Sequence, residues 1–281
     1  MEFTGERFVP GAGSAELFHE HVHRYRLASR FAPGRRILDV GSGEGFGAAM
    51  LKAAGAVACV GIDVDPEAVA HARAKYDEDG LVFKVAEAQA TALPDASFDL
   101  ITCFEVIEHI EDPRAVAHEI ARVLAPGGTA LISTPEKVAY NAMTGAPNPF
   151  HVAEMTQTEF AALLDTAFPS VTMLEQRSLV TSWIGPLGRG LDGADVNIEH
   201  GAHPTDATFL VAVCGDTALD LDASLFLDGS QQATPERLEL ARQTSRARDQ
   251  LAAYERDIQA IAEALRNADA EVQRLQGLLG G

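Results

Sequence analysis

A glycine-rich turn between a β-strand and a helix constrains the fold of this chain more than any other feature. An apolar run at 36–40 leads into Gly41-Ser42-Gly43-Glu44-Gly45, and a helix is expected over 45–54. Glycines at such a turn let the backbone bend sharply and approach a ligand closely. A dinucleotide-binding fingerprint would need a third glycine where Phe46 stands. The turn therefore predicts an α/β fold with a ligand at the end of its first strand, and it disfavours NAD.

An acidic residue follows the second expected strand. Asp63 comes directly after the apolar run 57–62, and the strand that ends here follows the glycine turn. A carboxylate at this place can accept hydrogen bonds from both hydroxyls of a ribose. The glycine turn and the acid together predict a ligand that contains a nucleoside.

Short β-rich runs alternate with helical segments from residue 36 to about 216. This alternation predicts a parallel sheet with helices on both faces. The expected strands are 36–40, 57–62, 81–85, 98–103, 129–133, 171–175 and 208–214, and the expected helices are 14–31, 45–54, 66–76, 113–123 and 158–168. The segment between the fifth strand and the last of these helices is expected to be a loop.

Composition excludes several classes of protein. The chain has 281 residues and a formal net charge of −19, which argues against nucleic acid as its main partner. Its three cysteines lie far apart in apolar runs, so we expect buried, reduced thiols and a cytoplasmic protein. We expect no membrane span, because no run of about 18 apolar residues occurs, and no signal peptide at the N-terminus.

Five ordered motifs carry a resemblance to a known family. They are Asp-Val-Gly-Ser-Gly-Glu-Gly from Asp39, Val-Gly-Ile-Asp ending at Asp63, Val-Ala-Glu-Ala ending at Ala88, Ser-Phe-Asp-Leu from Ser97, and Arg-Val-Leu-Ala-Pro-Gly-Gly from Arg122. In this order they resemble the motifs of class I S-adenosylmethionine-dependent methyltransferases over about residues 36–134. The resemblance implies a Rossmann-like seven-stranded methyltransferase fold whose last strand is antiparallel.

The same resemblance implies a cofactor site for S-adenosylmethionine. The first glycines would pass under the methionine part, Asp63 would hold the ribose, and Glu87 would lie near the adenine amino group. Glu87 stands where many members of the family have aspartate. The residues implied for cofactor binding are Asp39, Gly41, Ser42, Gly43, Asp63, Glu87 and Ala88.

A cluster of potential metal ligands follows the fourth expected strand. Glu105, Glu108 and His109 have the spacing i, i+3, i+4, which places them on one face of a helical turn. Val106, Ile107 and Ile110 would then turn into the protein. Two carboxylates and an imidazole suit a divalent ion. A solvated acidic helix start, favoured by the helix dipole, is the alternative.

A histidine from a distant loop adds a fourth candidate ligand. His151 follows the fifth strand and leaves the same edge of the sheet. The pattern Glu-x-x-Glu-His, then Ser-Thr-Pro, then His-x-x-Glu-x-Thr resembles the metal-dependent branch of the superfamily, which includes small-RNA 3′-terminal ribose 2′-O-methyltransferases and ubiquinone-pathway O-methyltransferases. The resemblance implies that Glu105, Glu108, His109 and His151 hold Mg²⁺ or a similar ion, with His109 and His151 serving catalysis.

This metal site predicts the chemistry of the acceptor. A divalent ion lowers the pKa of a bound hydroxyl and can chelate two adjacent hydroxyls, so a vicinal diol is the natural acceptor. We expect a metal-assisted O-methyltransferase that acts on a sugar or polysaccharide. A catechol or quinone-precursor O-methyltransferase is the first alternative, and RNA ribose 2′-O-methylation is disfavoured by the charge. A nucleotide-sugar oxidoreductase and a non-catalytic assembly module are the alternatives of a different class.

The N-terminal arm, residues 1–35, is expected to carry a helix. Its sequence resembles the arm of bacterial methyltransferases often encoded beside glycan genes. This weaker resemblance places the helix over the cofactor pocket and makes His21, Arg24 and Tyr25 candidates for cofactor or acceptor contacts. A plain surface helix is the alternative.

The remaining segments complete the expected organisation. The methyltransferase domain would span 36–216 and include a long segment, 181–204, of a length typical of functional lids or of disordered segments. Its Trp183 is expected to pack on the core, and stacking on a sugar is the alternative. A linker at 217–233 precedes a heptad seam over 234–279, which predicts a C-terminal coiled-coil helix. We expect the protein to form a homo-oligomer through this helix. Packing of the helix against its own domain is the alternative.

Overall fold

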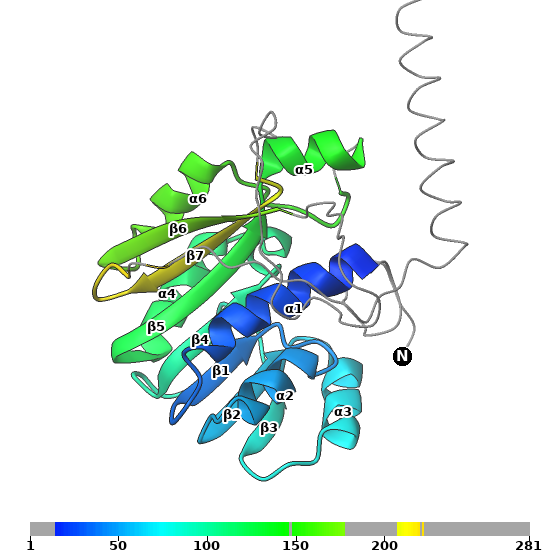
Figure 1. Cartoon of the computed structure of the whole chain (residues 1–281), viewed down its shortest axis with the longest axis vertical. Coiled ribbons are helices and arrows are strands. Elements are labelled where there is room, and N and C mark those ends of the chain that lie inside the picture. Colours follow the sequence, from blue (N-terminus) through cyan, green and yellow to red (C-terminus); the bar gives the residue numbers. More distant parts are fainter. Residues whose placement is uncertain (1–14, 146–147, 178–206, 220, 222–281) are drawn as a thin grey trace, which may run out of the picture. The chain divides into compact units, whose positions relative to one another are not determined.

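Seven strands form a single sheet at the centre of the fold (Figure 1). They are β1 (Arg36–Val40), β2 (Ala58–Asp63), β3 (Leu81–Val85), β4 (Phe98–Phe104), β5 (Leu124–Pro135), β6 (Ser170–Gln176) and β7 (Phe209–Gly215). Their order is β3-β2-β1-β4-β5-β7-β6, and β7 is antiparallel to both of its neighbours. This confirms the expected Rossmann-like seven-stranded α/β fold with an antiparallel last strand.

The computed structural model describes residues 15–145, 148–177, 207–219 and 221. The chain divides into two units, 1–228 and 229–281, and the second lies outside the described residues. The long segment at 181–204, nearly all of the linker at 217–233 and the heptad seam at 234–279 lie outside them as well.

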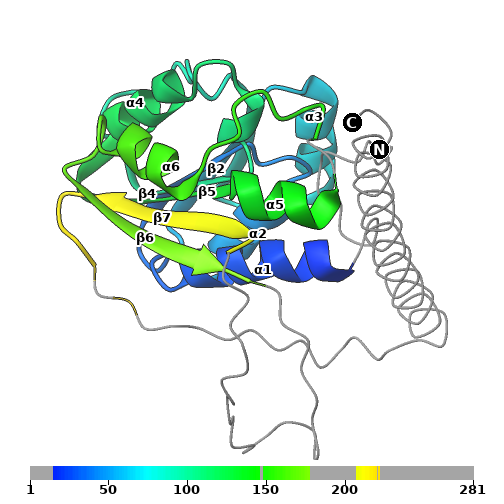
Figure 2. The ribbon, with the colours of Figure 1, turned by 90° about the horizontal axis from the view of Figure 1, so that it is seen from above.

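Helices cover both faces of the sheet (Figure 2). The helices are α1 (Ala15–Ser29), α2 (Phe46–Ala53), α3 (Pro66–Lys75), α4 (Pro113–Val123), α5 (Lys137–Thr144) and α6 (Gln157–Leu164), with a short 3₁₀ helix, η1 (Ile107–His109). Buried apolar side chains of α1, α2 and α3 form one core layer, and those of α4 and α6 form the other. The sheet lies between these layers, which leaves the ends of its strands to carry a site.

Local capping explains why several helices begin where the sequence indicates. Asp65 accepts a hydrogen bond from the Glu67 amide at 2.8 Å and precedes Pro66, the first residue of α3. Asp112 caps α4 in the same way, and Thr156 and Glu159 form a reciprocal capping box at α6. Each device satisfies amide groups that a helix leaves unpaired at its first turn.

Helix α5 was not expected from the sequence, which indicated a loop after the fifth strand. The Glu136 side chain accepts hydrogen bonds from the amides of Val138 and Ala139, and the helix ends at Gly145 with φ +77°. The helix has only eight residues and none of them is buried, so its apolar pattern is too short to separate a helix from a loop.

Two other expectations concern the whole chain. Cys59, Cys103 and Cys214 are all buried and unpaired, as expected. Among the described residues, no helix is both long enough and apolar enough to cross a membrane.

Candidate active site

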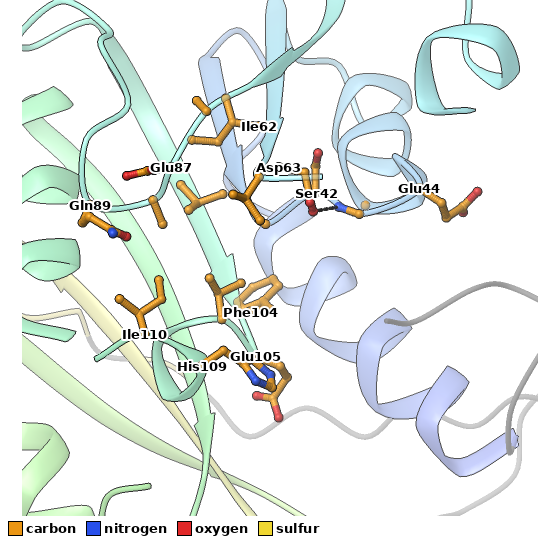
Figure 3. A pocket seen from close by; sticks show the side chains of 18 of the residues that line it. Ser42, Glu44, Ile62, Asp63, Glu87, Gln89, Phe104, Glu105, His109 and Ile110 are labelled. Carbon is orange, nitrogen blue, oxygen red and sulfur yellow. Dashed lines mark hydrogen bonds between the residues drawn. The ribbon is translucent and has the colours of Figure 1, made fainter. Parts of the chain in front are cut away.

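A cavity of about 720 Å³ opens where β1, β2 and β4 end (Figure 3). Asp63 and Glu87 lie toward one end of it, and Glu105 and His109 lie toward the other. Of the seven residues expected to bind the cofactor, six line this cavity: Gly41, Ser42, Gly43, Asp63, Glu87 and Ala88. The cavity therefore joins the predicted cofactor residues to part of the predicted metal cluster.

The turn after β1 requires its glycines. Gly41 has φ +70° and Gly43 has φ +52°, a region that residues with a side chain rarely adopt. A Cβ added to Gly41 would lie 2.3 Å from Cγ2 of Val106. The backbone here therefore passes close to the segment after β4, with no room for a larger residue.

Asp63 joins the end of β2 to the glycine turn. Its Oδ2 accepts a hydrogen bond from the Gly43 amide at 2.8 Å, and its Oδ1 accepts one from the Asp65 amide at 2.9 Å. Figure 3 shows the first of these bonds as a dashed line. The carboxylate is thus fixed at the cavity wall, so loss of Asp63 would disturb both the ligand surface and the turn.

Asp39 does not line the cavity, although the sequence placed it among the cofactor-binding residues. Its carboxyl group is fully buried and accepts hydrogen bonds from Tyr25 Oη at 3.0 Å and from Thr102 Oγ1 at 2.7 Å. Burial raises the pKa of Asp39 to about 7. The structure gives Asp39 the task of holding α1 and β4, behind the ligand surface.

The N-terminal helix packs against the fold and contributes to the cavity wall. Val22, Tyr25 and Ala28 are buried in the interface of α1 with the sheet layer, so α1 is more than a plain surface helix. His21 and Tyr25 line the cavity. The Nδ1–H of His21 donates to the Leu17 carbonyl oxygen at 2.9 Å, and burial, with Arg24 nearby, lowers the pKa of His21 to about 3. His21 is therefore neutral at physiological pH.

Arg24, the third candidate of the arm, is not a lining residue. Its side chain is buried, and its Nε donates to Gln176 Oε1 at 2.7 Å. Its guanidinium lies over the Phe209 ring, 4.6 Å from the ring centroid, and its Nη1 is 3.4 Å from Glu105 Oε1. Arg24 therefore contacts Glu105, which lines the cavity, but Arg24 itself does not line the cavity.

Three of the four predicted metal ligands do come together. The ligand atoms of Glu108, His109 and His151 all lie within 4.8 Å of one another. The Glu108 side chain is buried, and its Oε1 has no hydrogen-bond partner among the described residues. Burial and then the nearby Glu105 carboxylate raise the pKa of Glu108. A cation beside Glu108 would offset both penalties on its charge.

Each histidine of this triad is oriented by a second hydrogen bond. Nδ1 of His109 bonds to the Phe150 carbonyl oxygen at 3.0 Å, and Nδ1 of His151 bonds to Glu154 Oε1 at 3.0 Å. These bonds fix the tautomers in which Nε2 carries a lone pair, as is typical of histidines that bind metals. The Asn148 amide donates to His151 Nε2 at 3.1 Å, so it competes for that lone pair.

The loop that carries His151 is tied to η1 through its backbone. The amides of Val152 and Ala153 both donate to the Glu108 carbonyl oxygen at 2.9 Å. Thr134, at the end of β5, donates to Glu108 Oε2 at 3.2 Å. These bonds explain how residues far apart in the sequence form one cluster.

Glu105 does not belong to the cluster of ligand atoms that Glu108, His109 and His151 form, so the described residues do not show the expected set of four. Its φ of +55° is in the left-handed region, and the turn that follows is a 3₁₀ helix that begins only at Ile107. The Glu105 carboxylate accepts a hydrogen bond from Ser133 Oγ at 2.6 Å and faces Arg24. The spacing i, i+3, i+4 assumed an α-helical turn that the backbone does not make.

The apolar residues of this segment turn into the protein, as expected. Ile107 is fully buried in the core, and Val106 and Ile110 pack against that core while they also line the cavity. Ser133 and Glu154 belong to the quoted motifs Ser-Thr-Pro and His-x-x-Glu-x-Thr, but no role was predicted for either residue. The i, i+3 spacing of His151 and Glu154 could have indicated their ion pair, whereas the motif does not indicate that Ser133 contacts Glu105.

Comparisons with known proteins show which protein family this chain is similar to. The family described as "Methyltransferase domain" matches residues 38–132. A probable S-adenosylmethionine-dependent methyltransferase of Mycobacterium tuberculosis is 33% identical over 218 residues, which cover 76% of this chain and 74% of that protein. A similarly named protein of Mycolicibacterium smegmatis is 40% identical over 171 residues, and this chain spans 65% of its length.

The fold has counterparts among solved structures. The PH0226 protein of Pyrococcus horikoshii superposes with a TM-score of 0.56 at 17% identity, covering 77% of this chain and 100% of that one. A shorter match, 38% identical over 43% of this chain and 61% of the relative, is the ubiquinone biosynthesis O-methyltransferase of Methylococcus capsulatus.

The strand order defines the fold as the Rossmann-like, seven-stranded methyltransferase type. With the mycobacterial relatives, the chain belongs to the S-adenosylmethionine-dependent methyltransferases. Its cofactor is S-adenosylmethionine.

Proposed function

We propose that this protein is an O-methyltransferase that uses a divalent ion to methylate a hydroxyl group of a sugar or polysaccharide. The observation that carries this proposal is the Glu108–His109–His151 triad, whose His109 also lines the cavity. The proposal adds a type of acceptor atom and an acceptor class to the methyltransferase assignment.

The cavity supports a defined orientation of the cofactor. We propose that the ribose hydroxyls bond to Asp63, that the adenine lies toward Glu87 and Ala88, and that the methionine part follows the turn at Gly41 and Gly43. The volume of about 720 Å³ is in the range of small-molecule sites, with room beside the cofactor for an acceptor group. This orientation directs the reactive methyl group toward the end of the cavity where His109 lies.

The triad has the features of a metal site. One buried carboxylate oxygen without a hydrogen-bond partner among the described residues and two histidines with fixed tautomers provide three donors. When bound, a divalent ion lowers the pKa of a coordinated hydroxyl and orients its oxygen for in-line attack. Glu154 and the Phe150 carbonyl hold the imidazoles in place for this role.

The reaction balances without a further reactant. The acceptor oxygen forms a bond to the methyl carbon, the bond between that carbon and the sulfonium sulfur breaks, and the hydroxyl proton leaves to water. The products are a methyl ether and S-adenosylhomocysteine. The chain's own residues contribute position: the glycine turn and Asp63 for the donor, and the triad for the acceptor.

A catechol or quinone precursor is the second candidate acceptor. It also presents two adjacent hydroxyls, and the match to a protein named ubiquinone biosynthesis O-methyltransferase favours it. RNA ribose remains disfavoured because the chain carries a net charge of −19. Sugar diols and catechols are therefore the two classes to compare.

The test uses S-adenosylmethionine with an isotopically labelled methyl group and a panel of sugars, polysaccharides and catechols. We expect label in a methyl ether, loss of transfer after chelation with EDTA, and recovery when a divalent ion is restored. His109→Ala and His151→Ala should abolish transfer while cofactor affinity stays within about threefold. His118→Ala, an exposed histidine of α4, is the matched control and should transfer at the wild-type rate.

Full activity in EDTA-treated protein would refute the role of the metal. Label on nitrogen or carbon would refute O-methylation. Transfer to catechols alone would select the second candidate.

A further inference from the structure

Arg24 and Ser133 hold Glu105 beside the metal triad but outside its ligand cluster. The Arg24 side chain is 2% exposed and is fixed on three sides, by Gln176, Phe209 and Glu105. Nη1 and Nη2 of Arg24 have no hydrogen-bond partner among the described residues, and Glu105 is the anionic group beside them. A buried guanidinium depends strongly on its anionic neighbour, because breaking such a pair leaves an uncompensated charge.

Glu105 is held to this position by more than its charge. Its Oε1 accepts from Ser133 Oγ at 2.6 Å, and its amide donates to the Ser133 carbonyl oxygen at 3.2 Å. The backbone at Glu105 is left-handed, with φ +55°, and the ligand-atom cluster contains Glu108, His109 and His151 without Glu105. Ser133 and Arg24 both contact Glu105 Oε1, so movement of this carboxylate into the triad would disturb the hydrogen bond and the ion pair together.

We infer that Arg24 is a positioning residue that keeps Glu105 out of the metal ligand set and thereby sets the metal preference of the site. The protein donors are then one carboxylate and two imidazoles, from Glu108, His109 and His151. This inference rests on the proposed metal-assisted function. It departs from the four-ligand, Mg²⁺-type centre that the sequence resemblance implies.

The donor set indicates which ions the site favours. Mg²⁺ binds oxygen ligands and keeps its waters, whereas imidazole nitrogens favour first-row transition ions such as Fe²⁺ and Co²⁺. Two histidines and one carboxylate form a ligand set that leaves coordination positions open. Those open positions suit two adjacent hydroxyls of an acceptor. Glu105 as a fourth protein ligand would add a second carboxylate, which favours Mg²⁺, and would occupy one of the open coordination positions.

Electrostatics act on both ions alike. Arg24 adds a positive charge beside the Glu105 and Glu108 carboxylates, and a nearby positive charge opposes a cation at the triad. Mg²⁺ and Co²⁺ carry the same charge, so loss of this repulsion raises both affinities by a similar factor. A change in the ratio of the two affinities therefore reports a change in the ligands.

The test is calorimetric titration of the full-length protein with Co²⁺ and, separately, with Mg²⁺. Visible absorption of bound Co²⁺ reports its ligands. Glu105→Gln should leave the Co²⁺ spectrum unchanged and lower the affinity by less than about tenfold, through loss of a nearby negative charge. Glu108→Gln, which removes a ligand, should change the spectrum and lose about 100-fold or more. These two variants make the same chemical change three residues apart, so each is the control for the other.

Arg24→Met, which keeps the length of the side chain over Phe209, releases Glu105. The ratio of Co²⁺ affinity to Mg²⁺ affinity should fall by about tenfold in this variant. In the double variant Arg24→Met/Glu105→Gln, the ratio of Co²⁺ affinity to Mg²⁺ affinity should return to the wild-type value. Loss of the Arg24 charge affects both ions, and the Glu105 carboxylate that could bind the metal is absent. If Arg24→Met does not fold, Ser133→Ala frees Glu105 with a smaller change and should shift the ratio in the same direction.

The outcomes separate this inference from the function on which it rests. If wild type binds Co²⁺ and Glu105→Gln loses as much affinity as Glu108→Gln, Glu105 is a ligand and the inference is overturned, while metal-assisted transfer stands. An unchanged ratio in both Arg24→Met and Ser133→Ala also overturns it. If wild type binds neither ion, the metal-assisted function fails and the inference fails with it.

Discussion

Replacing Gly47 with alanine tests how the N-terminal helix is fixed over the cavity. Gly47 lies in the first turn of α2, and a Cβ added there would come within 1.8 Å of Tyr25 Cζ and 2.3 Å of its hydroxyl oxygen. The Tyr25 ring is buried and packs edge-on against Phe104 with centroids 5.1 Å apart. The ring therefore has to leave its place, and its hydrogen bond to Asp39 is lost with it.

The size of the effect follows from these contacts. Overpacking of a filled core costs about 1–3 kcal/mol. The lost hydrogen bond to the buried Asp39 carboxyl group adds about 1.5–3 kcal/mol. Alanine is favoured over glycine inside a helix by about 0.5–1 kcal/mol, which offsets part of the loss. We expect Gly47→Ala to lower the free energy of unfolding by about 2–5 kcal/mol and to weaken S-adenosylmethionine binding, because Tyr25 lines the cavity.

Urea unfolding at constant pH measures the loss, and calorimetry measures the binding. Tyr25→Ala supplies the control, because it removes the ring that the new methyl group would meet. In the Tyr25→Ala background, Gly47→Ala should cost less than about 1 kcal/mol, a clear departure from additivity. An equal loss in both backgrounds would show that the close contact between Gly47 and Tyr25 does not control stability.

Three further predictions concern the cofactor, pH and the tail. Asp63→Ala should weaken S-adenosylmethionine binding by about 1.5–3 kcal/mol, the scale of a hydrogen bond to a charged group, and unchanged calorimetric affinity would contradict its role. Burial raises the pKa of Asp39 from 3.8 to about 7, so between these values the folded protein keeps a proton that the unfolded chain has released. The stabilisation from this proton is therefore complete below about pH 4 and is lost as the pH rises through 7. In Asp39→Asn, the urea concentration at half-unfolding should change less between pH 5 and 7 than it does in wild type. The same pH dependence in both proteins would refute this prediction. A chain that ends at Ala233 should stay folded and bind the cofactor. By light scattering, the mass of the assembly should fall by more than the removed segment 234–281 of every subunit accounts for, because subunits separate. The same number of subunits in both proteins would contradict a coiled-coil assembly.

The first strands of the sheet and the turns that follow β1 and β2 could be predicted because their signals are local. The glycine turn, the acid after β2 and the Asp-Pro starts of α3 and α4 each act within a few residues, and each appears where expected. Six of the seven residues predicted for the cofactor line a single cavity for the same reason. Their positions follow directly from the ends of adjacent parallel strands.

The cluster of Glu108, His109 and His151 could be predicted only in part, because it depends on backbone conformation and on long-range partners. The sequence brought Glu108, His109 and His151 together correctly, but it placed Glu105 with them by assuming an α-helical turn. A left-handed conformation at a glutamate has no sequence signal. Burial of Arg24 against residues more than 150 positions away has none either.

One crystallographic measurement tests the central claim most directly. Crystals grown with S-adenosylhomocysteine and Co²⁺, recorded at the cobalt absorption edge, locate the cofactor and the ion in the same experiment. We expect the ribose hydroxyls on Asp63 and an anomalous peak bounded by Glu108, His109 and His151, with the cofactor sulfur facing that peak. A cofactor placed as expected with no peak at the triad, or with the peak at a different group of residues, would contradict metal-assisted methyl transfer at this site.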